Sequence, residues 1–269
     1  MKSSTQLIKY IAISLAIALT IGIVLFVITI ITQFGNAFIK TETNEKYDEI
    51  KTNTNISILD IDVKDVNVFI KKGEKLKIET NNKDIQIEEK DNKTFIVEKK
   101  HNIFKHDDSD LIIYIPEDLT FDVIALESGA GKVSIETLKT KKLDFDLGAG
   151  KVEIVDLTVL TSAEINGGAG AIEINNSYIN DLELELGVGK LELTSKLTGY
   201  YQFICGIGES NINLIGSQTD YKIKIDKGIG SAKIENDSIK DNTYQGNGDN
   251  IIDIDGGIGK INIDFIPQI

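Results

Sequence analysis

A Gly-x-Gly triplet that recurs about every 19 residues is the feature that most constrains the fold of this chain. Successive triplets are separated by 19, 20, 19 and 19 residues, and then by 22 and 29. A fixed period of this length indicates a repeat protein, in which each unit packs against its neighbours in a stack. The glycines of the seven triplets are Gly129, Gly131, Gly148, Gly150, Gly168, Gly170, Gly187, Gly189, Gly206, Gly208, Gly228, Gly230, Gly257 and Gly259.

Apolar residues flank each triplet at alternate positions. Around the first triplet, Ile124 and Leu126 come before the glycines, and Val133 and Ile135 come after them. Most of the equivalent positions around the other triplets are also apolar, whereas the residues between them are mostly polar. Alternation by two is the strand period, so two strands meet at a glycine corner and share a core. We expect the middle residue of each triplet, which is small or apolar, to point into that core.

The repeat predicts an all-β fold, a single-stranded β-solenoid (a β-helix or β-roll) with about 19–20 residues per rung. Glycine permits the positive φ or tight bend that each corner needs. Residues 119–269 form the regular array, with rungs stacked in succession, and the longer last intervals predict inserted loops, one of them around residues 236–250. Whether a rung has two or three sides is left open.

Residues 51–118 lack the triplet but still resemble β-structure. We expect them to form irregular first rungs that cap the N-terminal edge of the solenoid, because an open strand edge invites aggregation. The predicted strands are Ile56–Ile61, Val66–Ile70, Leu76–Glu79, Ile85–Glu88, Thr94–Val97 and Leu111–Ile115.

An uncharged apolar stretch over residues 11–31 predicts a transmembrane helix. Its length matches the roughly 30 Å hydrocarbon core of a bilayer. Two lysines precede it, so residues 1–10 are expected to be a short cytoplasmic tail, with residues 32–50 as a linker on the other side. The expected location is therefore the cell membrane, with a single pass and an extracytoplasmic C-terminal domain.

Two small residues leave an alternative to the retained anchor. Gly35 and Ala37 follow the apolar stretch and fit a signal-peptide cleavage site. A secretory signal usually has a shorter apolar region, so the retained anchor is the preferred interpretation.

Composition excludes some functions. The net charge is −13, no arginine is present and no basic patch stands out, so the chain is not expected to bind nucleic acid. The single cysteine, Cys205, excludes an internal disulfide. It lies in the same column as Leu147 and Leu186, which favours a buried apolar role over a reactive thiolate.

Two sequence motifs resemble ligand sites only in part. Gly129–Lys132 lacks the earlier glycine and the following Ser or Thr of a phosphate loop, so no nucleotide is expected. Calcium-binding nonapeptide repeats need aspartate where Ile172 and Ile261 stand, and a period of nine residues. We therefore predict no cofactor.

One loop has the composition of a metal site. The candidate ligands are weak ones, since nothing in the sequence orients them and a solvated loop explains them better. They are His101, His106, Asp107 and Asp108, with Asp110 close by.

Stacked glutamates follow one outward column. Glu153, Glu173 and Glu192 indicate a solvated face, on which cations or flanking lysines offset the repulsion between like charges. No acid–base pair stands out in the sequence, so we predict that the protein is not an enzyme and has no catalytic residue.

The repeat also carries a resemblance to a family. The runs Leu111–Pro116, Phe121–Leu126 and Gly129–Ile135, with the later repeats of the last run, resemble the bacterial "putative adhesin" domain over about residues 55–265. This resemblance implies a β-solenoid on a bacterial cell envelope, often joined to a transmembrane segment, and it assigns no catalytic residue. It also implies an alternative, because relatives occur beside envelope-stress regulators.

The expected function is a membrane-anchored, non-catalytic binding or scaffolding module at the cell envelope. A regular face presents the same groups at regular intervals and suits an envelope polymer or a membrane protein as partner. The alternative is an extracytoplasmic sensor or regulatory partner of an envelope-stress membrane system. Self-assembly through the ends of the solenoid is a third hypothesis.

Overall fold

The computed structural model describes residues 47–50, 56–99 and 109–267. The chain divides into two compact units, residues 1–44 and 45–269, and the described residues belong to the second. The predicted tail and transmembrane helix, and most of the predicted linker, lie outside the described residues. Among the residues that are described, no helix has the length and apolar character needed to cross a membrane.

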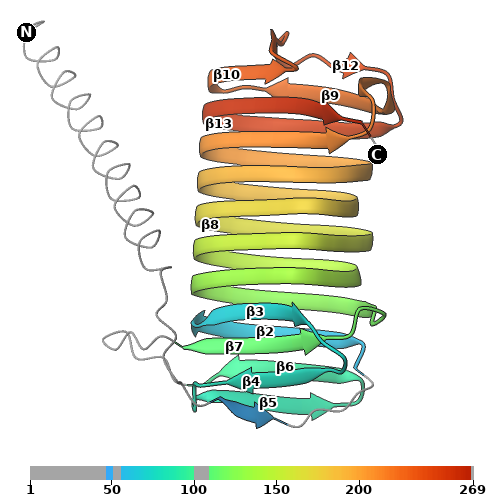
Figure 1. Cartoon of the computed structure of the whole chain (residues 1–269). Helices are drawn as coiled ribbons and strands as arrows, with labels where there is room; N and C mark the ends of the chain where they lie inside the picture. Colours follow the sequence, from blue (N-terminus) through green and yellow to red (C-terminus); the bar gives the residue numbers. More distant parts are fainter. Residues whose placement is uncertain (1–46, 51–55, 100–108, 268–269) are drawn as a thin grey trace, which may run out of the picture. The chain divides into compact units, whose positions relative to one another are not determined.

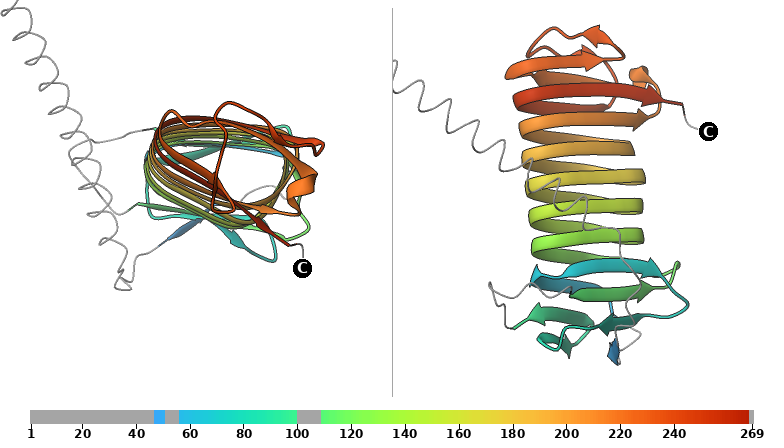
Figure 2. Two further views of the ribbon diagram at one scale, coloured as in Figure 1. Left: turned by 90° about the horizontal axis from the view of Figure 1, so that it is seen from above. Right: turned by 60° about the vertical axis from the view of Figure 1, so that its left-hand side comes forward.

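The described residues are almost entirely β-strand, as predicted, and they wind into a stack (Figure 1). Viewed along the stack, each turn is a flattened loop with two long sides (Figure 2). The strands are β1 Asp48–Ile50, β2 Ile58–Asp65, β3 Asn67–Lys72, β4 Lys77–Thr80, β5 Ile85–Lys90, β6 Lys93–Glu98, β7 Asp110–Ile115, β8 Phe121–Ile215, β9 Tyr221–Asp226, β10 Ile229–Ile234, β11 Asp237–Ser238, β12 Gln245–Gly246 and β13 Asn250–Ile266, with the short helix η1 Gln218–Asp220 before β9.

The regular part of the stack is β8, a continuous 95-residue strand that passes through the first five glycine corners. Its inward residues are the predicted apolar columns, and they form one core with the strands at both ends. Phe145, Leu184 and Phe203, which occupy the same column on three rungs, are fully buried.

Further strands add to the N-terminal end of the stack, and a β-strand overlaps each of the six predicted stretches. Strands β2 and β3 form a rung that pairs in parallel with the first turn of β8, with Ile61 opposite Leu126. Strands β6 and β7 pair with the other side of this rung. Strands β5 and β4 then add antiparallel to β6 and β7, and β1, which falls within the predicted linker, adds to β4.

The C-terminal rungs do not stack in sequence order, contrary to the expected succession. Strand β13 places Gly259 between Gly208 of β8 and Gly230 of β10. After β8 the chain forms the terminal rung with β9 and β10. It then returns, so that β13 lies between this terminal rung and the last turn of β8. The predicted insertion supplies β11 and β12, which pair antiparallel with β10 and β9 and cover part of the open edge.

The glycine corners are required by close backbone contact. A Cβ on Gly189 would lie 1.7 Å from the carbonyl oxygen of Gly170 on the rung below, and the φ of Gly189 is +151°. The same clash would occur at Gly208, where the carbonyl oxygen of Gly189 is 1.7 Å from the Cβ position. No side chain fits between rungs at this corner, so glycine is needed on both sides of the middle residue.

The middle residues of the triplets do not point into the core, so that prediction was wrong. They are half-buried or exposed, and Ile258 and Ile229 have 46% and 71% of their surface exposed. The inner side of the corner is already filled, because Ile172 and Leu186 both approach Gly167 there. The middle residues therefore lie on the outside of the bend.

The corner contact predicts different effects for two glycines of similar position. Gly189→Ala should lower the free energy of unfolding by at least about 3 kcal/mol, because the new Cβ meets backbone and the residue has positive φ. Gly167→Ala should lower it by only about 1 kcal/mol, because its Cβ would press mainly on the side-chain ends of Ile172 and Leu186, which can shift, and would meet backbone only at ordinary contact distance. Urea unfolding of both variants measures the difference, and equal effects would contradict this account of the corner.

Candidate binding surface

The two long sides of the solenoid carry different outward residues. We call the side formed by the strands that follow the corners the ladder face, and the side formed by the strands that precede them the trough face. The ladder face includes Lys132, Lys151, Glu153, Glu173, Asn175, Lys190, Glu192, Asn211 and Asn262. The trough face includes Lys142, Asp144, Asp146, Ser162, Glu164, Asn166, Asp181, Glu183, Glu185, Tyr200 and Gln202.

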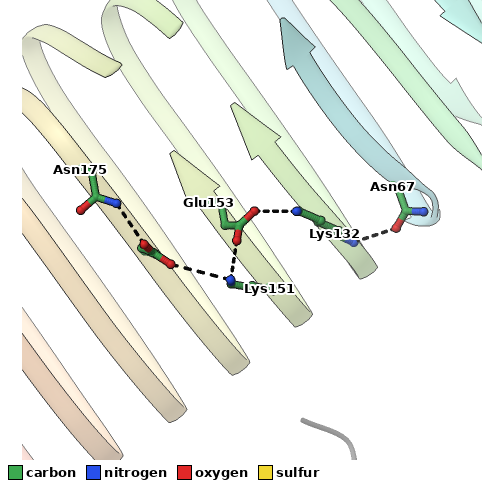
Figure 3. A network of polar contacts seen from close by, with 6 residues as sticks. Asn67, Lys132, Lys151, Glu153 and Asn175 are labelled. Atoms are coloured by element: carbon green, nitrogen blue, oxygen red, sulfur yellow. Dashed lines mark hydrogen bonds and ion pairs between the residues drawn. The ribbon is translucent and has the colours of Figure 1, made fainter. Parts of the chain in front are cut away.

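Charges on the ladder face are paired from rung to rung (Figure 3). Lys132 lies 2.6 Å from Glu153, and Lys151 bridges Glu153 and Glu173. The amide of Asn175 donates to Glu173 at 3.1 Å and extends the chain of contacts. The prediction that flanking lysines offset the repulsion along this glutamate column is therefore confirmed.

The same pattern continues along the upper rungs of the ladder face. Lys190 lies 2.7 Å from Glu192, which also accepts a hydrogen bond from Asn211 at 2.8 Å. Burial alone would raise the pKa of Glu192, but these two donors outweigh it and lower the pKa. The charged side chains of these rungs thus satisfy one another and leave little for a ligand to add.

Carboxylates on the trough face are not compensated in this way. Asp144, Asp146, Glu164, Glu183 and Glu185 form no ion pair with any residue that the structure describes. Burial raises the pKa of Asp144, and the neighbouring carboxylates, chiefly Glu164, raise it further. This face therefore carries unbalanced negative charge, which favours a cationic partner.

A shallow depression of about 360 Å³ runs along the trough face. Its lining comes from five successive turns of β8, which are about 4.8 Å apart, so its length is roughly 20 Å. The lining residues are Val123, Lys142, Leu143, Asp144, Ser162, Ala163, Glu164, Asp181, Leu182, Glu183, Tyr200 and Gln202.

Tyrosines mark the C-terminal end of this trough. Tyr200 belongs to the lining, and its hydroxyl donates to Asp253 Oδ2 on the next rung at 3.1 Å. Tyr244, from the inserted segment, donates to the same oxygen at 3.3 Å. The acidic trough and the two rings together form an elongated polar surface that sequence reasoning did not single out.

The other candidate residues have structural roles or lie outside the described part. His101, His106, Asp107 and Asp108 are not among the described residues. Within those that are, no group of three or more His, Cys, Asp or Glu is placed to hold a metal ion. Asp110 is buried and accepts hydrogen bonds from Tyr47 at 2.8 Å and Asn67 at 3.0 Å, so it tethers the N-terminal strands.

Cys205 has the environment of a core residue rather than of a nucleophile. It is half-buried, and Ser210 donates to its Sγ at 3.3 Å. Burial raises the pKa of the thiol, so the thiolate is disfavoured.

Comparisons with known proteins agree with this architecture. The model of a family described as Toastrack DUF4097 matches residues 49–244. A "putative adhesin" from Bacteroides fragilis NCTC 9343 has the same fold, with a TM-score of 0.53 and 17% identity over 82% of this chain and 96% of that one. A "putative cell adhesion protein" from Clostridium sporogenes ATCC 15579 is 17% identical over 82% of this chain and 99% of that one, with a TM-score of 0.37. No curated protein matches the chain.

The ladder predicts a pH-dependent contribution from Glu153. Burial opposes its charge, but Lys132 and Lys151 lower its pKa below 4.5, so its stabilising effect is present above pH 4.5 and is lost as the pH falls through the lowered pKa. Glu153→Gln should lower the free energy of unfolding by about 1 kcal/mol at pH 7 and by less at pH 3, where part of the contribution of the carboxylate is lost.

Glu185→Gln is the matched control, because Glu185 is exposed and unpaired with any described residue. It should leave stability unchanged or raise it slightly at pH 7. Chemical unfolding of both variants at the two pH values gives the comparison. A pH-independent loss in Glu153→Gln would show that its ion pairs do not stabilise the fold.

Proposed function

Because this chain belongs to the Toastrack DUF4097 family, and the matched region contains most of its solenoid, we propose that it is a non-catalytic binding or scaffolding module of a bacterial cell envelope. The Bacteroides fragilis structure with the same fold bears the name "putative adhesin". That name, together with the resemblance of the repeat to the adhesin domain, supports an adhesin-like role in which the solenoid holds an extended partner.

The trough face carries this proposal. Its depression crosses five turns of β8, so a ligand that fills it must itself be long and repetitive. The carboxylates of Asp144, Glu164 and Glu183 recur at the same position on consecutive rungs and attract positive charge along the middle three of these turns. An envelope polymer fits this surface better than a small molecule does.

Geometry of the carboxylates supports binding rather than catalysis. Glycoside hydrolysis needs two carboxyl groups on opposite sides of the scissile bond, one of them acting as acid and the other as base or nucleophile. The trough carboxylates instead project from one face of one sheet, in columns. A polymer lying on that face meets all of them from the same side.

Display outside the cell membrane completes the proposal. The uncharged stretch over residues 11–31 serves as the single membrane anchor, with its N-terminal end in the cytoplasm. The solenoid then lies in the extracytoplasmic space, where its partner is wall polymer or another envelope component. A regulatory contact with an integral membrane protein is the alternative.

Site-specific photocrosslinking in living cells tests this function. A photoreactive amino acid at Ser162 places the probe in the trough, and one at Ser134 places a matched probe on the ladder face. We expect envelope polymer to be attached at position 162 and not at position 134.

Other products would lead to other conclusions. Recovery of an integral membrane protein from position 162 would favour the regulatory alternative. Recovery of further copies of this chain would indicate self-assembly. Equal attachment of polymer at both positions would show that the trough is not the binding surface.

A further inference from the structure

Tyr200 and Tyr244 form a pair of half-exposed rings at one end of the trough. Their side chains come from β8 and from the inserted segment, and 47% and 41% of their surfaces are exposed. Both hydroxyls donate to Asp253 Oδ2, so one carboxylate on β13 holds the two rings next to each other.

The ring of Tyr244 is further fixed by cations. Lys222 Nζ lies 4.6 Å from its centroid, and Lys224 Nζ lies 5.3 Å from it. Lys224 is also 3.7 Å from Asp253 Oδ2. An aromatic side chain that is both exposed and held in place provides a flat contact surface at little entropic cost on binding.

Hydrogen-bonding groups in the trough are mostly acceptors. Asp144, Glu164 and Glu183 only accept when ionised, whereas Ser162 and Gln202 both accept and donate. Asp253 Oδ1, beneath the two rings, is buried and has no donor among the described residues, so the acceptors open to a ligand are those of the other trough residues. The ligand must therefore bring donors, in the form of hydroxyl or ammonium groups.

An extended peptide fits this surface less well than a sugar chain. Peptides usually bind by adding a strand to a sheet edge or by filling apolar pockets. The trough crosses the outward face of β8 and does not lie at a sheet edge, because the turns that line it pair with one another. Its outward groups are mostly polar. A pyranose ring instead packs its C–H face on an aromatic ring and directs its hydroxyls to polar side chains.

We propose that Tyr200, Tyr244 and Asp253 form the end subsite of a polysaccharide-binding trough, and that the polysaccharide carries free amino groups. The rings stack on one sugar unit, and the column of carboxylates pairs with ammonium groups on the units that follow. This inference rests on the proposed binding function and adds the chemical class of the polymer.

Titration of the full-length chain in detergent with sugar oligomers tests the proposal. The probes are the β-1,4-linked glucosamine hexamer, its fully N-acetylated counterpart and hexalysine. We expect the free-amine hexamer to bind, and the acetylated hexamer to bind at least tenfold more weakly because it has lost its cations.

Tyrosine variants separate ring stacking from charge alone. Tyr200→Ala and Tyr244→Ala should each weaken binding of the glucosamine hexamer about tenfold, whereas Tyr200→Phe, which keeps the ring, should retain most of the affinity. Tyr178→Ala is the matched control, because Tyr178 is 39% exposed but lies outside the trough lining. Its substitution should leave the affinity unchanged.

Three results would overturn the inference. These are equal losses in the Tyr178 and Tyr200 variants, binding of hexalysine in preference to the sugar, and absence of binding to either sugar hexamer. If Tyr244→Ala lowers the free energy of unfolding but leaves the affinity for the glucosamine hexamer unchanged, Tyr244 only stabilises the inserted segment and does not contact the ligand. If crosslinking at Ser162 still recovers envelope polymer in any of these cases, the binding function stands, and only the tyrosine subsite or the class of polymer is wrong.

Discussion

The backbone contact between stacked glycines determines the rest of this structure. At each corner the carbonyl oxygen of one rung occupies the place where a side chain of the next would be, as between Gly170 and Gly189. This contact holds every rung in the same register, so inward residues form continuous apolar columns and outward residues form continuous polar ones. Both long faces are consequences of that register, since a slip of one residue would exchange core and surface.

Much of this fold could be predicted from the sequence, because its information lies in a period. The triplet spacing gave the rungs, and alternation gave the core positions and the strands of the N-terminal cap. Two features of the fold were not predicted correctly. The small or apolar character of the middle residues placed residues such as Ile229 inside, whereas the chain bends around a corner that other side chains already fill. The spatial order of the last rungs was the second. A longer interval between glycine triplets indicates an insertion, but it does not indicate beside which rung the chain resumes.

The candidate site was missed for a related reason. All outward acids were interpreted as one solvated surface, although the lysines are not distributed evenly. A lysine follows the triplet at positions 132, 151 and 190, where it pairs with a glutamate of the ladder face. Between Asp144 and Glu185 the trough face has no such partner among the described residues. This asymmetry was present in the sequence, but the contribution of Tyr244 was not, because it depends on where the inserted segment folds back.

The order of rungs at the two ends also affects how the stack comes apart. The strands β2 and β13, which pair with the first and last turns of β8, are each hydrogen-bonded along both edges. Apart from β1, the outermost described strands belong to segments that leave the stack and return to it. Fraying from a terminus therefore cannot unwind the solenoid one rung at a time, as it does in repeat proteins whose end units are also their chain ends. A mechanical load on β13 would have to shear two rows of hydrogen bonds together, so the last strand of the solenoid resists extraction more strongly than an edge strand would.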